Sequence, residues 1–249
     1  MAVNVEVNEA AQTQPATTKS QGTDNSNNVK SEESFQQIPN PDGLIMIRRV
    51  IPADNSCLFN CIGYCLENKS MDRARELREI ACGYIMSEPE KYNEAFLGGK
   101  SNSAYCEWLM KDSSWGGAIE LDIFSRHYQT EICAIDIQSL VPNIFGQDGN
   151  YDTRIYLLYD GIHYDLFARN ISEDMDPKTD ITVFSPNDKY AFEGAMTLAR
   201  ELNRKRQFTD VNNFTIQCGV CYKKLKGEVE AIEHNKATGH ANFQEVQNN

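Results

Sequence analysis

The 249-residue sequence lacks both a membrane-spanning segment and an excess of basic charge. No stretch approaches the roughly 20 apolar residues that a helix needs to cross a bilayer. Residues 1–20 have neither a basic n-region nor an apolar h-region, so we expect no signal peptide and a cytoplasmic location, with the nucleus as an alternative. The 24 basic residues face 36 acidic ones, and a net charge of −12 disfavours nonspecific binding to nucleic acid or anionic membranes.

Disulfides are not expected either, because an intracellular compartment keeps thiols reduced. The eight cysteines are then buried thiols, metal ligands or a nucleophile. Histidine is scarce, with four in the chain. Hydrophobic residues make up 41% and charged residues 24%, as in an ordinary globular protein.

Residues 1–43 are rich in Asn, Gln, Ser and Thr and have a single aromatic residue, Phe35. Such a segment cannot bury enough apolar surface to offset its ordering entropy, so we expect a disordered polar tail. A second, short tail is expected at 244–249.

Dense apolar patterning begins at Leu44 and predicts an α+β domain over 44–170, because helices precede strands along the chain. Residues 171–213 are expected to hold a strand and an amphipathic helix as a linker to a small module at 214–243. The expected strands cover 44–51, 131–138, 154–159 and 162–167, with a loop at 142–152. The expected helices cover 57–68, 72–87, 118–128 and 188–206, with further helix within 90–110 that is broken at Gly98 and Gly99.

Cysteine and histidine spacing in the last segment predicts a structural zinc finger. A Cys-x-x-Cys pair is followed after twelve residues by two histidines five residues apart, which is the ligand spacing of a tetrahedral zinc site. Leu225 and Ala231 would supply its apolar packing. The expected ligands of a single zinc ion are Cys218, Cys221, His234 and His240.

The helix expected within the finger, residues 228–240, is acidic where a groove-reading helix needs Arg, Lys, Asn or Gln. DNA or RNA binding is therefore disfavoured. A protein-binding or purely structural finger fits the charge better.

Cys57 stands where a helix is expected to begin, after the capping residues Asn55 and Ser56. A helix N-terminus stabilises negative charge, so we expect a lowered thiol pKa and free backbone N–H groups for an oxyanion. Cys61 and Cys65 lie one and two turns deeper and are expected to be small core residues.

His163 follows an Asp-Gly hairpin signal at residues 160–161. Side chains alternate along a strand, so Asp165 shares a face with His163 and can hold one nitrogen of its ring. A nucleophile, base and orienting acid at Cys57, His163 and Asp165 would suit cysteine hydrolysis. His127 is an alternative base, more simply explained as a residue on a helix surface.

Three motifs occur together: DNSCLF at 54–59, WGGAIEL at 115–121 and YDGIHYD at 159–165. In this order and spacing they resemble the ovarian-tumour (OTU) family of cysteine deubiquitinases, in the subfamily with a C-terminal two-Cys, two-His zinc finger. The resemblance runs from Leu44 to the end of the chain. It implies a papain-like catalytic domain that removes or trims ubiquitin in protein quality control.

The resemblance assigns roles to particular residues. Cys57 matches the nucleophile, His163 the general base and Asp165 the residue that orients it. Asp54 matches the acidic residue that opens the Cys loop and shapes the oxyanion hole. No metal is implied in catalysis.

The family's variable loop matches residues 113–123, and its His loop matches 159–163. Both flank a channel for the ubiquitin tail, with Trp115 and Ile162 as expected walls. Glu120 and Asp122 are expected to attract the arginines of that tail. A second ubiquitin is expected near residues 187–192.

Some members of the family carry an N-terminal ubiquitin-like adaptor that docks an AAA unfoldase. Residues 1–43 are too short and polar for such a domain, so that partnership is doubtful here. Three alternatives stay open: the same chemistry on another modifier ending in Gly-Gly, a non-catalytic ubiquitin-binding module, and an RNA-binding zinc-finger protein.

Overall fold

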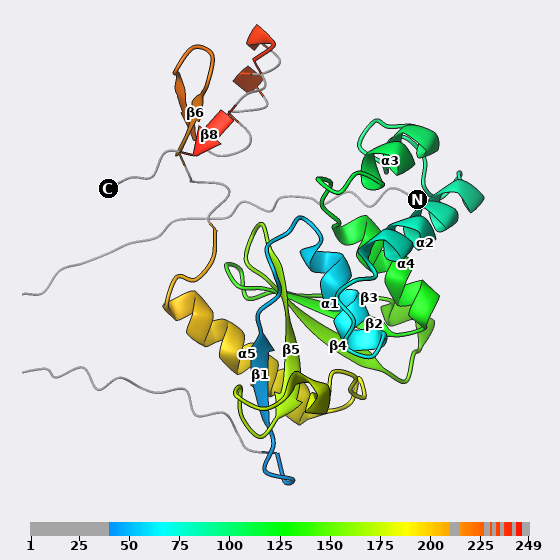
Figure 1. Cartoon of the computed structure of the whole chain (residues 1–249), viewed down its shortest axis with the longest axis vertical. Coiled ribbons are helices and arrows are strands. Elements are labelled where there is room, and N and C mark those ends of the chain that lie inside the picture. Colours follow the sequence, from blue (N-terminus) through cyan, green and yellow to red (C-terminus); the bar gives the residue numbers. More distant parts are fainter. Residues whose placement is uncertain are drawn as a thin grey trace, which may run out of the picture. The chain divides into compact units, whose positions relative to one another are not determined.

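The computed structural model describes residues 40–209, 215–226, 230, 233–234, 237–240 and 243–245 (Figure 1). Most of the expected N-terminal tail and the last residues of the expected C-terminal tail lie outside this range. None of the helices within the described ranges is long and apolar enough to cross a membrane.

In the larger domain one strand and four helices precede the other four strands, and a fifth helix follows them. The helices are α1 (Cys57–Leu66), α2 (Ala74–Ser87), α3 (Asn102–Leu109), α4 (Ala118–Tyr128) and α5 (Lys189–Arg204). The strands are β1 (Ile45–Arg49), β2 (Glu131–Asp136), β3 (Pro142–Phe145), β4 (Arg154–Tyr159) and β5 (Tyr164–Asn170). Two short 3₁₀ turns, η1 (Gln147–Gly149) and η2 (Pro177–Thr179), lie in the connections.

These five strands form one mixed sheet in the order β1-β5-β4-β2-β3. Only the β2–β4 pair is parallel; β1 pairs with β5, β4 with β5 and β2 with β3 in antiparallel fashion. The first strand of the domain therefore lies beside the last one. This pairing of β1 with β5 brings Arg48 and Asp165, which are 117 positions apart in the chain, into contact.

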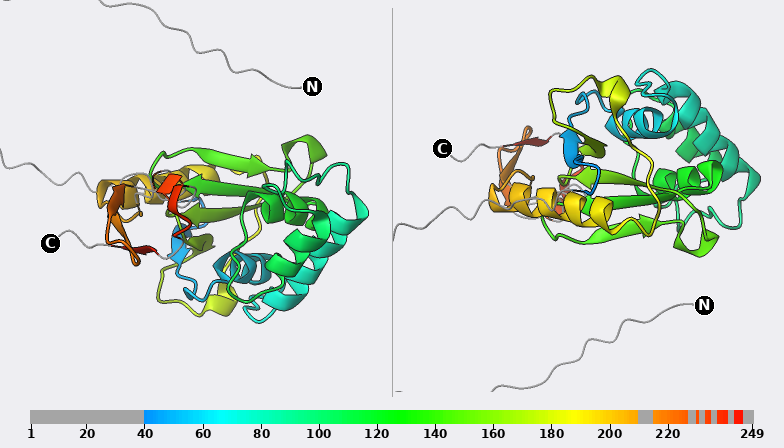
Figure 2. Two further views of the ribbon diagram at one scale, coloured as in Figure 1. Left: turned by 90° about the horizontal axis from the view of Figure 1, so that it is seen from above. Right: turned by 90° about the horizontal axis from the view of Figure 1, so that it is seen from below.

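Alternation of side chains along the strands gives the sheet two apolar faces. One face packs against α1, α2 and α4 through residues such as Ile47, Leu157 and Leu166. The other face packs against α5 through Tyr156, Phe167 and their neighbours. Figure 2 shows the helices on the two sides of the sheet, with α5 opposite α1.

The sequence expectations and the structure differ in three places. Residues 142–145, expected in a loop, form the edge strand β3. The strand expected at 162–167 begins later, at Tyr164, and leaves His163 in the preceding turn. The strand expected after residue 171 is reduced to two isolated bridges, Arg154–Phe184 and Arg169–Ile181.

The small module forms a three-stranded sheet in the order β7-β6-β8. Its strands are β6 (Thr215–Cys218), β7 (Lys224–Lys226) and β8 (Phe243–Glu245). Leu225 is buried, as expected for the packing of a small finger. Ala231 and five other residues of the expected helix at 228–240 lie outside the described residues.

A buried cluster around Asp180 fastens β1 to the connection that follows β5. The Asp180 carboxylate accepts hydrogen bonds from Arg49 Nε (2.6 Å), Tyr64 Oη (2.6 Å) and Asn170 Nδ2 (2.7 Å). Although burial opposes it, these bonds hold the pKa of Asp180 below its usual value. The cluster therefore stabilises the protein fully above the unfolded carboxyl pKa, and this stabilisation is lost as the pH falls through the depressed folded value.

We expect Tyr64→Phe to lower the free energy of unfolding by about 2 kcal/mol, because it removes a hydrogen bond to a buried carboxylate. Urea unfolding at neutral pH measures this loss. Tyr222→Phe is the control, since Tyr222 is 71% exposed. A loss no larger than that of the control would show that the Tyr64 hydroxyl contributes nothing to stability.

Candidate active site and metal centre

The loop that presents Cys57 is shaped by the Asp54 carboxylate. Asp54 accepts hydrogen bonds from Ser56 N–H (3.0 Å) and from the Asn60 side-chain amide (3.1 Å). Asn55 takes a left-handed conformation, with φ of 63°, which turns the chain sharply before the helix. Cys57 is then the first residue of α1, as expected.

A buried arginine also supports the loop that presents Cys57, and no sequence motif pointed to it. Arg78 of α2 is 2% exposed and lies over the Phe59 ring at 4.2 Å. It donates to the Asn55 carbonyl and to Ser56 Oγ, both at 3.3 Å. An arginine at an inward position of a helix is the one signal that could have revealed it.

Cys57 is half-buried, and the backbone N–H of Tyr164 lies close enough to its sulfur to influence the pKa of the thiol. The nucleophile candidate therefore lies directly beside the residue that follows His163. Burial raises the pKa of the Cys57 thiol above its ordinary value, although this backbone N–H opposes the rise. The expectation of a lowered thiol pKa is wrong for this site, and forming a thiolate here requires a base.

The imidazole of His163 is held by Asp165, which the sequence analysis placed on the same face. His163 Nε2 lies 3.1 Å from Asp165 Oδ1. Because Nε2 faces the carboxylate, Nδ1 is the nitrogen left for a thiol or a substrate. The turn before it is closed by Asp160, whose Oδ1 accepts from the N–H groups of Ile162 (3.0 Å) and His163 (2.8 Å).

Asp165 has two further partners that the sequence did not reveal. Arg48 of β1 donates from Nε to Asp165 Oδ2 at 2.7 Å, and the Ile51 N–H donates to Oδ1 at 2.7 Å. Asp165 is 2% exposed, so these partners satisfy a buried carboxylate and fix its position. The β1–β5 register, which aligns Arg48 with Phe167, brings these groups together.

Trp115 and Ile162 remain accessible, at 52% and 44% exposure. The Trp115 indole N–H donates to Asn55 Oδ1 at 2.7 Å and so ties the variable loop to the Cys loop. The backbone at Gly116 lies against α1, where a Cβ would approach the Phe59 ring to 3.0 Å. The variable loop therefore packs against the loop and the helix that present Cys57.

The predicted contact of Glu120 with a substrate is wrong, because this side chain is 1% exposed. Its carboxylate accepts from Gly117 N–H (2.7 Å) and Tyr105 Oη (2.8 Å) and thereby closes the first turn of α4. Burial raises its pKa. Asp122 is engaged as well, in an ion pair with Lys91 at 2.8 Å.

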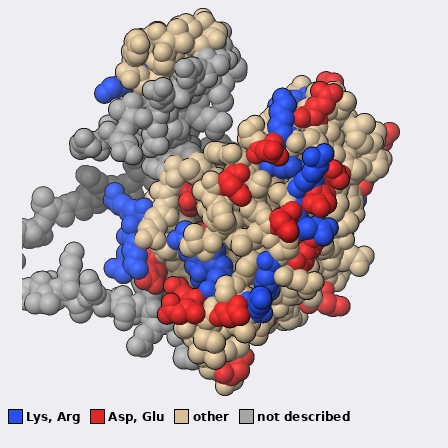
Figure 3. Space-filling view, viewed as in Figure 1, with Lys and Arg blue, Asp and Glu red and all other residues tan. Residues whose placement is uncertain are grey.

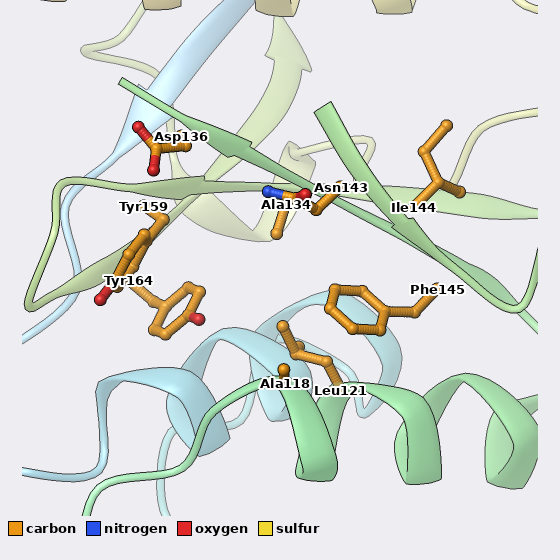
Figure 4. A pocket seen from close by; sticks show the side chains of 9 residues that line it. All are labelled: Ala118, Leu121, Ala134, Asp136, Asn143, Ile144, Phe145, Tyr159 and Tyr164. Atoms are coloured by element: carbon orange, nitrogen blue, oxygen red, sulfur yellow. The ribbon is translucent and has the colours of Figure 1, made fainter. Parts of the chain in front are cut away.

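A pocket of about 450 Å³ opens between α4 and the sheet (Figure 4). Leu121 and Phe145 line its apolar part, and Tyr159 and Tyr164, which flank the His loop, lie together at one side. The Asp136 carboxylate lies at its margin.

The four expected metal ligands meet in the small module. The ligand atoms of Cys218, Cys221, His234 and His240 all lie within 4.8 Å of one another. Two sulfurs and two imidazoles at this distance fit a tetrahedral zinc ion. Although burial opposes it, N–H groups from Cys221 and Val220 lower the pKa of Cys218, and a thiolate is what zinc binding needs.

The other candidates lie elsewhere. His127 is on the exposed face of α4, beside Tyr84 and Tyr128. Cys61 and Cys65 are buried core residues, as expected.

Comparisons with known proteins agree with this geometry. Residues 52–168 match the model of the OTU-like cysteine protease family, and residues 212–246 match that of the C-terminal C2H2-type zinc finger of ubiquitin thioesterase OTU1. The ubiquitin thioesterase OTU1 of Gallus gallus is 49% identical over 205 residues, covering 81% of this chain and 67% of that protein. An Arabidopsis thaliana ovarian tumor domain-containing deubiquitinating enzyme is 47% identical, covering 81% of this chain and 98% of that protein.

The human ubiquitin thioesterase OTU1 is 47% identical, and the match spans 58% of its length. A solved structure of an OTU domain in complex with ubiquitin superposes with a TM-score of 0.58 and 32% identity, covering 67% of this chain and 91% of that one. Fold, motifs and finger thus agree, and the chain belongs to the OTU family of cysteine proteases, in the group with a C-terminal C2H2-type zinc finger.

Proposed function

We propose that this chain is a thiol-dependent deubiquitinase that hydrolyses isopeptide or thioester bonds at the C-terminal glycine of ubiquitin and trims ubiquitin from conjugates in protein quality control. The observation that carries this proposal is that Cys57, at the start of α1, lies close to Tyr164 and Asp165, and that Asp165 in turn pairs with His163. The division into a catalytic domain at 44–170, a linker at 171–213 and a finger at 214–243 remains a prediction.

The reaction proceeds by acyl transfer. His163 Nδ1 takes the proton of the Cys57 thiol, and the thiolate attacks the carbonyl of the terminal glycine. The same imidazolium then protonates the leaving lysine amine, and neutral His163 activates the water that hydrolyses the thioester. Asp165 holds the ring in orientation throughout.

Backbone N–H groups at the first turn of α1 stabilise the oxyanion of the tetrahedral intermediate. They are unpaired within the helix because its first four N–H groups have no intrahelical acceptor. Asp54 acts by positioning: it holds the Ser56 N–H and Asn60, which fixes the loop at the conformation that presents these donors.

The surface beside Cys57 suits a tail that ends in two glycines. Trp115 and Ile162 are exposed and would flank the approach, and glycine residues need the least room between them. The pocket between α4 and the sheet would take an apolar side chain earlier in the tail, and Asp136 would attract a neighbouring arginine (Figure 4). Asp136 therefore takes the role first expected of Glu120.

The zinc finger is a structural module that binds one zinc ion and takes no part in the chemistry. Its two thiolates and two imidazoles would hold the metal and fix the β6–β7 turn. On the face of the larger domain shown in Figure 3, acidic and basic residues are interspersed.

Mixing the protein with ubiquitin that carries a C-terminal thiol-reactive group should add one ubiquitin to the chain, measured as intact mass. Cys57→Ala should abolish the adduct, whereas Cys82→Ala, which removes another half-buried thiol, should not. Absence of an adduct on the folded wild type would contradict the proposal. Capture by another Gly-Gly modifier instead would reassign the substrate but keep the chemistry.

We expect Arg48→Met to lower kcat about ten- to hundredfold, because Asp165 loses a charge-assisted hydrogen bond. Arg48→Lys should retain part of the activity, since it keeps the charge but not the planar fork. Hydrolysis of a fluorogenic ubiquitin substrate measures both variants. Arg75→Met, at an arginine whose side chain is 82% exposed, is the control. A kcat of Arg48→Met within twofold of the control would contradict the role given to Arg48.

Metal analysis should find one zinc per chain in the wild type and much less in His234→Ala, because the tetrahedral ligand set is broken. His127→Ala removes a histidine outside the cluster and should keep its zinc. The site assignment is wrong if His234→Ala retains a full equivalent of zinc.

A further inference from the structure

The His loop, residues 159–163, is held from two sides. From within, the Asp160 carboxylate accepts the N–H groups of Ile162 and His163, and the Asp160 N–H donates to the His163 carbonyl at 3.1 Å. These bonds set the backbone from which the imidazole projects. They leave the Asp160 carbonyl directed away from the turn.

That carbonyl accepts a hydrogen bond from the N–H of Thr209 at 2.7 Å. The contact is close on the next residue as well. Gly161 has φ of +108°, and a Cβ on it would lie 2.4 Å from the Thr209 carbonyl oxygen. The backbone of Thr209 therefore lies directly on the outer side of the His loop, with no side chain between them.

Thr209 is held in this place by the segment that follows α5, residues 205–209, which we name the tether. The Gln207 N–H donates to the Leu202 carbonyl at 3.0 Å, and this bond folds the tether back at the end of the helix. Phe208 packs against the apolar cluster between α5 and the sheet. The contact with Asp160 is thus made by an anchored backbone.

The tether is also the covalent attachment of the zinc finger. β6 begins at Thr215, six residues after Thr209. Six residues span at most about 22 Å, so the finger starts near the His loop whatever its orientation. A displacement of the finger would therefore be transmitted along the chain to the catalytic domain first at Thr209.

We propose that Thr209 is a positioning residue: its backbone N–H braces the His loop, so the tether that carries the zinc finger sets the turnover rate through His163. This inference rests on the proposed function for its kinetic consequence, but the contact itself can be tested without substrate. The side chain of Thr209 plays no part in it.

The test compares full-length, zinc-loaded Thr209→Pro, which lacks the N–H donor, with Thr209→Ala, which keeps it. Amide hydrogen exchange at Ile162 and His163 in the free protein should be faster in Thr209→Pro than in Thr209→Ala or the wild type. With a fluorogenic ubiquitin substrate, kcat of Thr209→Pro should fall about tenfold while KM stays within twofold. Thr209→Ala should stay within twofold of the wild type.

Phe208→Ala provides a second variant that loosens the anchor and leaves every N–H in place. Phe208→Ala should speed amide hydrogen exchange at Ile162 and His163 and lower kcat, as Thr209→Pro does, but by a smaller factor. If Thr209→Pro does not fold, Phe208→Ala alone tests whether the tether braces the His loop. Unchanged exchange at Ile162 and His163, or an equal loss of kcat in Thr209→Ala, would overturn the proposal. A wild type inactive on ubiquitin would refute the proposed function instead, and the exchange measurement would still decide whether Thr209 braces the loop.

Discussion

A carboxylate buried beside a reactive histidine must be fully paired, and the pairing of Asp165 determines much of this architecture. Its three partners come from segments far apart in the chain: Arg48 from β1, the Ile51 N–H just after β1, and His163 from the turn before β5. An unpaired buried carboxylate would be protonated or would pull water into the site. The sheet therefore has to place its first strand beside its last.

The Cys loop meets a comparable constraint. At the sharp turn of Asn55, Arg78 of α2 donates to the backbone carbonyl, and the Trp115 indole of the variable loop donates to the side-chain oxygen. Gly116 lets the variable loop approach the Phe59 ring of α1. The wall of the proposed substrate channel that contains Trp115 is consequently braced through the loop that carries the nucleophile.

The sequence was sufficient to locate residues whose function depends on local geometry. A helix start after a capping pair located Cys57, an Asp-Gly turn with period-two alternation paired His163 with Asp165, and metal-ligand spacing located the four residues of the finger. Arg48 escaped because its role depends on the register between strands 117 residues apart, which no local pattern encodes. Glu120 was misjudged because an acid in a loop motif suggests exposure, whereas helix capping buries it. The edge strand β3 escaped because Pro142 and Gly146 suggest a loop.

The pKa of the Cys57 thiol is raised, yet Cys57 can act as a nucleophile if the charges of Cys57, His163, Asp165 and Arg48 are considered together. Arg48 and Asp165 together contribute no net charge, and moving a proton from Cys57 to His163 creates a thiolate and an imidazolium whose charges also cancel. Burial penalises an isolated thiolate, but two opposite charges about 4 Å apart attract each other by about 4 kcal/mol at an effective dielectric constant of 20. The penalty on the thiolate is thus offset only when the imidazolium lies beside it. Since Asp165 holds the imidazole and Arg48 holds Asp165, the reactive form of the cysteine depends on the pairing of β1 with β5.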